Sequence, residues 1–104
     1  MNDQSTEEEI FVLLKPHIAE ALSIDPAEIE MASRIFLDLG AESIDVLDIR
    51  FRIEQTFDLK VEDQESFVRE LAEEMGTSQL QERLTVGGVV RYIRKQLRQQ
   101  AAAS

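Results

Sequence analysis

The amino-acid sequence predicts an all-α fold, a four-helix bundle with a long first loop and an extra short helix between the second and last helices. Apolar residues recur with the period of an α-helix along most of the 104-residue chain. Helix-capping patterns precede several of these stretches. The few runs of β-branched residues do not alternate with polar ones, so we expect no sheet. The length suggests one domain over residues 1–104, with both ends, about 1–5 and 100–104, frayed.

The first helix is predicted in residues 5–22, where acidic residues fill the first turn. Two capping boxes are available at its start, Ser5 with Glu8 or Thr6 with Glu9. Its apolar positions at helical spacing are Ile10, Leu13, Leu14, Ile18, Ala21 and Leu22. Pro16 should kink the helix or locally break its hydrogen bonding, because proline has no N–H to donate.

A long ordered loop should follow the first helix, because Asp25-Pro26 and Gly40 favour turns. We expect one short turn in this loop and contacts with the core from Ile29, Ile35, Phe36 and Leu39. The second helix is predicted to begin at Ser43 and to end near Phe57.

The second helix has apolar residues on two opposite faces when it is drawn at about 100° per residue. The face expected in the core contains Val46, Ile49, Ile53 and Phe57, with Arg50 at its edge. The opposite face contains Ile44, Leu47 and Phe51, bordered by Asp45, Asp48, Glu54 and Asp58. An apolar stripe with a carboxylate rim suits a partner with an apolar groove and a basic rim. The alternative is that residues 64–75 of the same chain cover this face.

Residues 59–84 contain two smaller helical patterns. The first has an apolar stripe of Phe67, Val68, Leu71 and Met75, and Gly76 should end it. The second is a short helix holding Leu80 and Leu84, for which Ser78 and Gln81 suit a capping box.

The last helix should begin after Thr85, a favourable N-cap residue. Its buried stripe is predicted to be Val86, Val89, Val90, Ile93 and Leu97. Gly87 and Gly88 lower the helix propensity of its first turn, which indicates close packing or backbone approach there.

The charge is strongly negative and unevenly distributed. The chain has 11 basic and 21 acidic residues, net −10, but residues 83–104 hold 5 basic residues and no acid. An acidic body disfavours nucleic acid and favours basic protein surfaces, although acidity also keeps a small protein soluble. The basic end could bind an anion or complement the C-terminus of the last helix. Without a signal peptide or a membrane-length apolar run, we expect a cytoplasmic monomer with no stable membrane insertion.

Ser43 is the candidate functional residue with the most alternatives. Serine is among the best N-cap residues, so capping of the second helix needs no further function. A hydrolytic nucleophile would need a base, but the single histidine, His17, lies in the first helix, and GAES lacks the G-x-S-x-G elbow. The nearby acids do not follow calcium-loop spacing, and the chain has no cysteine and no phosphate-binding glycine loop, so we expect no metal site.

The stretch DLGAESI from Asp38 to Ile44 resembles the Asp-Leu-Gly-x-Asp-Ser-Leu signature of acyl carrier proteins. The resemblance extends over nearly the whole chain and includes DPAEI in the first loop, IEQTF at the end of the second helix and TVGGVVRYI in the last helix. It implies an acyl-carrier-like bundle that is not an enzyme. It also implies that Ser43 covalently carries 4′-phosphopantetheine, from which acyl thioesters are presented to fatty-acid or lipid biosynthetic enzymes.

The resemblance also assigns neighbouring residues. Asp38, Leu39, Gly40 and Glu42 match positions flanking the modified serine. The partner-facing positions correspond to Ile44, Asp45, Leu47, Asp48, Phe51 and Glu54. The implied partners are a phosphopantetheinyl transferase and acyl-transferring or acyl-modifying enzymes with basic docking surfaces, and the implied ligands are acyl chains.

Several residues depart from the family pattern. Glu42 replaces an aspartate, Ile44 replaces a leucine, and Arg50 and Arg52 add positive charge to a usually acidic helix. The 26 residues between Asp58 and Thr85 also exceed the usual spacing. These departures resemble specialised carriers of very-long-chain or hydroxylated acyl groups, and the added helix could enlarge the acyl shelter. A carrier of polyketide or aminoacyl units and a helical interaction module without a prosthetic group remain alternatives.

Overall fold

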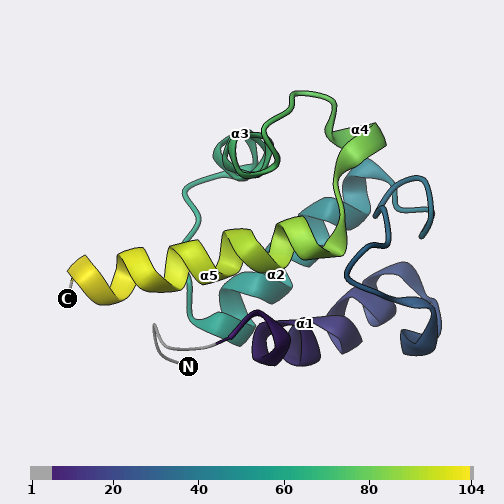
Figure 1. Cartoon of the computed structure of the whole chain (residues 1–104), viewed down its shortest axis with the longest axis horizontal. Helices are drawn as coiled ribbons and strands as arrows, with labels where there is room; N and C mark the ends of the chain where they lie inside the picture. Colours follow the sequence, from purple (N-terminus) through teal and green to yellow (C-terminus); the bar gives the residue numbers. More distant parts are fainter. Residues whose placement is uncertain (1–5, 104) are drawn as a thin grey trace.

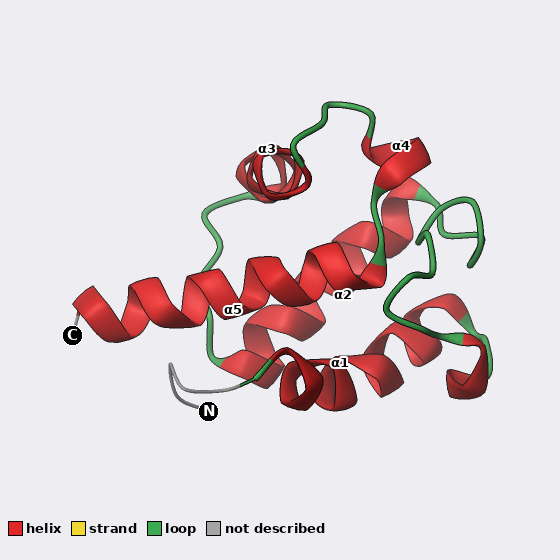
Figure 2. Cartoon of the chain, in the orientation of Figure 1, coloured by secondary structure: helices red, strands yellow, loops and turns green. Residues whose placement is uncertain are grey.

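The computed structural model describes residues 6–103, which form helices and no strand. The elements are α1 (Glu7–Leu22), the short 3-10 helix η1 (Pro26–Glu28), α2 (Ser43–Phe57), α3 (Gln64–Met75), α4 (Leu80–Arg83) and α5 (Val86–Ala103) (Figures 1 and 2). The predicted all-α fold is confirmed, as are the long first loop and the extra helix before α5. A single antiparallel bridge between Arg34 and Thr85 is the only β-type pairing in this part of the chain.

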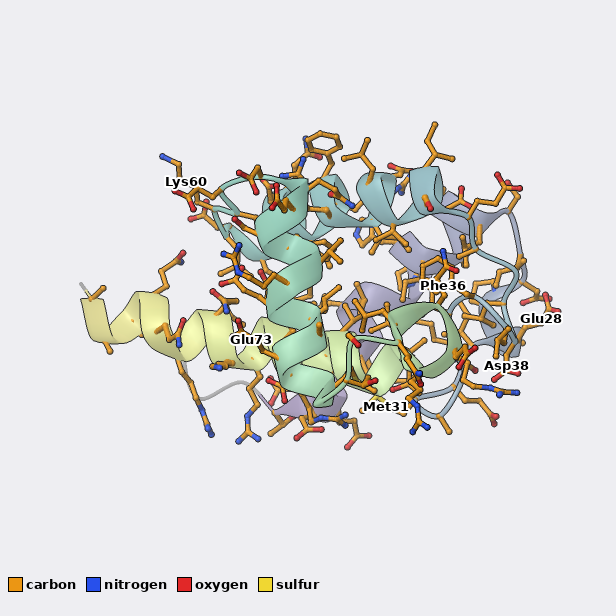
Figure 3. The ribbon with its side chains drawn as sticks, turned by 90° about the horizontal axis from the view of Figure 1, so that it is seen from above. Glu28, Met31, Phe36, Asp38, Lys60 and Glu73 are labelled. Atoms are coloured by element: carbon orange, nitrogen blue, oxygen red, sulfur yellow. The ribbon has the colours of Figure 1, made fainter. Side chains whose placement is uncertain are left out.

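Helices α1, α2 and α5 form the body of the molecule, and α3 lies across it. In Figure 1 α3 is seen end-on, and in Figure 3 it crosses the view between α2 and α5. The core between these helices contains fully buried side chains from each of them, including Ile10, Leu14 and Ile18 of α1, Ile53 of α2, Phe67 of α3 and Val90 and Ile93 of α5. Burial of these apolar groups is the main favourable term in folding, because it removes their surface from water.

The start of α1 is capped by Thr6, whose hydroxyl accepts the Glu9 N–H at 3.1 Å while the Glu9 carboxylate accepts the Thr6 N–H at 3.3 Å. The alternative box beginning at Ser5 falls outside the described residues, as do the expected frayed residues 1–5. Leu13, expected at the apolar stripe, is 42% exposed, because the core contacts only the narrower face defined by Ile10 and Leu14. The helix continues without a break through Pro16.

The segment after α2 follows the predicted pattern with one correction. Phe67 and Leu71 are buried, and Gly76 ends α3 with φ 67°, a backbone conformation that glycine adopts without steric cost. The capping box predicted at Ser78 is wrong, because α4 starts after Gln79. The Gln79 N–H instead donates to the Thr77 hydroxyl at 3.0 Å, so Thr77 forms the turn that leads into this single-turn helix.

The predicted N-cap of α5 at Thr85 and the predicted close packing at its first turn are both confirmed. The Thr85 hydroxyl accepts the Gly88 N–H at 3.1 Å. The Gly87 N–H donates to the Met31 carbonyl at 2.8 Å, and a Cβ atom on Gly88 would collide with the Met75 sulfur. The glycine pair therefore lets both the first loop and α3 approach α5. At its other end α5 remains helical to Ala103, which includes the described part of the residues expected to fray.

Candidate functional site

Ser43 is the first helical residue of α2, and it does not cap the helix as predicted. The N-cap position is taken by Glu42, whose backbone is extended at φ −111° and ψ 170°. Ser43 is exposed, and its hydroxyl forms no hydrogen bond with any residue between 6 and 103. The position of the helix start explains the correction, because the N-cap is the last residue with non-helical backbone and that residue is Glu42. The hydroxyl is therefore free to react.

The backbone around Ser43 leaves two donors without an acceptor. The Glu42 N–H is bound by an Asp45 carboxylate oxygen at 2.8 Å, and the Asp45 N–H donates to the Glu42 carbonyl at 3.0 Å. The Ser43 and Ile44 N–H groups have no acceptor among the described residues. Free N–H groups and the helix dipole make the start of α2 favourable for an anion attached at Ser43.

The loop that leads to Ser43 is held in place by Asp38 and Arg34. The Asp38 carboxylate accepts the Arg34 backbone N–H at 2.8 Å and its guanidinium N–H groups at 3.1 and 3.0 Å. These hydrogen bonds, first that from the Arg34 side chain, lower the pKa of Asp38. Gly40 then turns the chain with φ 75°, and the Ala41 N–H donates to the Ile35 carbonyl at 3.1 Å. Asp38 and Gly40 thus shape the approach to Ser43, while Leu39 is half-buried against the core.

An apolar cavity of about 450 Å³ adjoins Ser43, and we call it the Ser43 groove. It lies between α2, α3 and α4, on the side of the molecule viewed in Figure 3, and includes Phe36 from the first loop. Its lining residues are Phe36, Ser43, Ile44, Val46, Leu47, Gln64, Val68, Leu71, Leu80, Gln81 and Leu84. The groove can shelter an apolar chain that begins at Ser43.

The groove depends on residues that the sequence did not assign to the site. Of Phe67, Leu71 and Met75, the residues of the added helix expected to enlarge an acyl shelter, only Leu71 lines the groove. Val68 was recognised only as part of the apolar stripe of α3, and Gln64 was not singled out. Asp63 positions this end of α3, because its carboxylate accepts the Ser66 N–H at 2.7 Å. The N-cap pattern of Asp63 was readable from the sequence. The sequence did not show, however, that α3 lies beside α2 and forms one wall of the groove.

The two faces of α2 are those that the helical period predicts. Val46, Ile49, Ile53 and Phe57 are buried, and Arg50 is 9% exposed at their edge. On the opposite face Ile44 is 69% and Phe51 49% exposed, and Leu47 is half-buried beside the groove. The α3 segment therefore covers part of this face without hiding Ile44 or Phe51.

Two of the four carboxylates on the rim of α2, those of Asp48 and Glu54, are paired with arginines of the same helix. Asp48 accepts a hydrogen bond from Arg52 at 3.1 Å, and Arg52 also lies 3.5 Å from Glu20 of α1. Arg50 pairs with Glu54 at 3.1 Å. The two arginines that depart from the family pattern thus bind the predicted acidic rim, and Arg50 also lies over the Phe51 ring at 4.7 Å. This arrangement lowers the negative charge available to a basic partner.

The structure supports neither of the other chemistries considered for this region. His17 bonds to Thr56 at 3.0 Å, near the far end of α2. Since a helix rises 1.5 Å per residue, this position lies roughly 20 Å from Ser43 along the axis, too far for a nucleophile and its base. Among residues 6–103 there is no cluster of side chains suited to a metal ion. Within the same span no helix has the length and apolarity required to cross a membrane.

Comparisons with known proteins give a consistent result. A family model described as "Phosphopantetheine attachment site" matches residues 13–93. The acyl carrier protein of Thermotoga maritima is 32% identical over 93 residues, covering 89% of this chain and 98% of the relative. That of Wolinella succinogenes is 34% identical over 84 residues, covering 81% and 92% respectively. That of Clostridium acetobutylicum is 35% identical over 85 residues, covering 82% and 92%.

Proposed function

The chain belongs to the acyl carrier protein family, and from this premise we propose that Ser43 carries its 4′-phosphopantetheine. Members of this family are carriers and not enzymes, and the chain is accordingly a carrier with a covalently attached 4′-phosphopantetheine. One observation carries the assignment to Ser43: its unengaged, exposed hydroxyl lies both at the start of α2 and at the edge of the apolar groove. Asp38, Leu39, Gly40 and Glu42 form its approach.

The residues around Ser43 fit the attached group. Attachment would form a phosphodiester at the Ser43 oxygen as the diphosphate bond within coenzyme A breaks, and adenosine 3′,5′-bisphosphate would leave together with the hydroxyl proton. The free Ser43 and Ile44 N–H groups would favour this anion and offset repulsion from the Glu42 and Asp45 carboxylates. The group supplies a thiol that holds acyl chains as thioesters, the chemistry for which the cysteine-free chain has no residue of its own.

We propose very-long-chain or hydroxylated acyl groups as the cargo. Leaving an acyl chain in water costs about 0.8 kcal/mol per CH₂ group, so a long chain gains most from an apolar shelter. Val68 and Leu71 of α3 contribute to the groove from the segment that is longer than the family spacing. The argument for a long chain depends on α3, because without Val68 and Leu71 the side of the groove opposite α2 would be open. The mass of the cargo on protein purified from its source tests this choice against polyketide or aminoacyl units.

We propose that partner enzymes contact the exposed face of α2, formed by Ile44, Leu47 and Phe51 with Asp45, Asp48 and Glu54 around it. The partners are a phosphopantetheinyl transferase and acyl-transferring or acyl-modifying enzymes with basic docking surfaces. Because Asp48 and Glu54 are already paired with arginines, apolar contact at Phe51 should contribute more than long-range charge attraction. We further propose that the chain acts as a monomeric, single carrier domain, since the five α-helices described between residues 6 and 103 contribute to or pack against one core.

The attachment is tested by intact mass after coexpression with a broad-specificity phosphopantetheinyl transferase. The wild-type chain should gain the mass of one phosphopantetheine, and Ser43→Ala should gain none. Ser78→Ala, which removes another exposed serine, is the matched control and should be modified like the wild type. Modification of Ser43→Ala would move the site elsewhere. An unmodified wild type with several transferases would favour a helical interaction module without a prosthetic group.

A further inference from the structure

A row of basic side chains follows one side of α5. We call this row the α5 basic stripe, and its members are Arg91, Arg94, Lys95 and Arg98. At about 100° per residue the four positions fall within roughly a third of the helix circumference, opposite the buried residues Val89 and Ile93. Arg94 is half-buried and the other three are exposed. The stripe is therefore a positive surface that faces away from the core, on a chain whose net charge is −10.

The C-terminus of the helix does not account for the stripe. Basic side chains stabilise a helix C-terminus through its dipole, but the effect falls off within the last turn. The last turn of α5, which ends at Ala103, contains no basic residue. The expectation that these charges complement the helix end is thus not met.

The pairing of the stripe with acidic residues of the same chain is weak. The Arg91 Nε atom lies 3.9 Å from a Glu74 carboxylate oxygen, and the Arg94 Nη1 atom lies 3.5 Å from one of Glu7. Both distances exceed those of a well-formed charged hydrogen bond. The other two members form no hydrogen bond or ion pair with any residue between 6 and 103. The stripe therefore keeps most of its capacity to bind carboxylates.

The surroundings of the stripe favour a narrow anionic partner. Glu7 and Glu74 border it, so a wide anionic lipid surface or a duplex nucleic acid would meet these carboxylates and the acidic remainder of the chain. The described part of α5 also presents no large exposed apolar side chain for insertion into a membrane. A protein segment with several carboxylates can follow the row, which extends about 10 Å from Arg91 to Arg98, without covering its acidic borders.

We propose that the α5 basic stripe is a second docking surface, which binds a carboxylate-rich segment of a partner protein. Figure 3 shows α2 and α5 on opposite sides of α3, and the stripe faces away from the core that the helices share. A partner on α5 therefore leaves Ser43 and the exposed face of α2 accessible. This inference goes beyond the proposed function, because it lets an acidic protein hold the carrier while other enzymes contact α2. Complementary charge supplies the recognition and speeds the encounter.

Binding of a fluorescein-labelled decaglutamate peptide to the full-length chain tests the surface by fluorescence anisotropy. At about 0.1 M ionic strength, charges more than about 10 Å away are largely screened, so contact with the stripe should outweigh repulsion from the acidic body. The wild type should bind decaglutamate and should not bind a peptide of the same length with alternating glycine and serine. Affinity should fall as the ionic strength is raised to about 1 M, where the screening length is about 3 Å.

Matched charge-reversal variants locate the binding. Lys95→Glu combined with Arg98→Glu should weaken peptide binding by about tenfold, because two exposed attractive pairs become repulsive. Lys60→Glu combined with Arg83→Glu replaces the same residue types at exposed positions outside α5, changes the net charge equally and should leave the affinity within about twofold of wild type. Circular dichroism checks the helix content, and Lys95→Gln combined with Arg98→Gln decides the result if the reversed charges perturb folding.

Three outcomes would overturn the proposal. One is a wild type that does not bind decaglutamate, and another is an equal loss of affinity in the stripe and control variants, which would reduce the effect to net charge. The third is binding of vesicles of phosphatidylcholine and phosphatidylserine without binding of the peptide, which would assign the stripe to a lipid surface. The stripe variants should also accept phosphopantetheine at the wild-type rate. A slower rate would place the stripe in the interface with the transferase and contradict a separate docking surface.

Discussion

Replacing Ser43 with alanine should leave the stability of the unmodified protein almost unchanged, while the proposed function requires that it abolish attachment. The hydroxyl is exposed and forms no hydrogen bond with residues 6–103, so its removal breaks no internal interaction. Alanine also has a slightly higher helix propensity than serine, by a few tenths of a kcal/mol. We therefore expect the free energy of unfolding to change by no more than about 0.5 kcal/mol.

Thr85→Ala is the matched control, because Thr85 caps a helix in the manner first expected for Ser43. Its hydroxyl accepts the Gly88 N–H at 3.1 Å, and loss of such a cap costs about 1 kcal/mol. Both variants remove a hydroxyl at a helix start, but only one removes a hydrogen bond. The comparison thus isolates the difference between a capping residue and a residue exposed for modification.

Urea unfolding of the unmodified proteins, followed by circular dichroism, measures both changes. With a slope of about 1–3 kcal/mol per molar urea, Thr85→Ala should lower the midpoint by about 0.3–1 M, and Ser43→Ala should shift it by less. A loss of 1 kcal/mol or more in Ser43→Ala, comparable to that in Thr85→Ala, would refute the reasoning. It would mean that the Ser43 hydroxyl accepts a backbone hydrogen bond in solution.

Two further predictions concern docking and the approach loop. Phe51→Glu should slow acyl transfer to partner enzymes without loss of helix content. The control Val12→Glu changes an apolar residue of α1 that is 63% exposed, and it should leave the transfer rate unchanged. Equal transfer rates of the two variants in steady-state assays would argue against docking at α2. The contact with Arg34 lowers the pKa of Asp38 in the folded state, so the ionised Asp38 carboxylate stabilises the fold at pH values above its unfolded pKa of about 3.9. This contribution to the free energy of unfolding is lost as the pH falls through the lower pKa of the folded state. Asp38→Asn should therefore be less stable than wild type in urea unfolding at neutral pH, and the gap should close in strong acid; a gap independent of pH would exclude the Arg34 contact as its cause.

Local patterns were sufficient to predict the helices and both faces of α2. The helical period separates Val46 and Ile53 from Ile44 and Phe51 wherever the helix packs, because it is a property of backbone geometry. Thr85 capping and the stop at Gly76 also depend on adjacent backbone groups. The family signature around Ser43 is equally local, so the sequence alone sufficed to identify Ser43 as the candidate for modification.

The sequence determined by itself which residues are apolar, which stretches form helices, and which serine stands in the family signature. Only the tertiary structure decided what lies beside them. Arg52 binds Glu20 across two helices, and Gln64 meets the Ser43 groove because α3 crosses α2. Likewise, the Ser43 hydroxyl does not cap α2 because the N-cap position is one residue earlier, at Glu42. Such contacts join residues far apart in the chain or depend on the exact end of a helix, and neither is encoded in a local period.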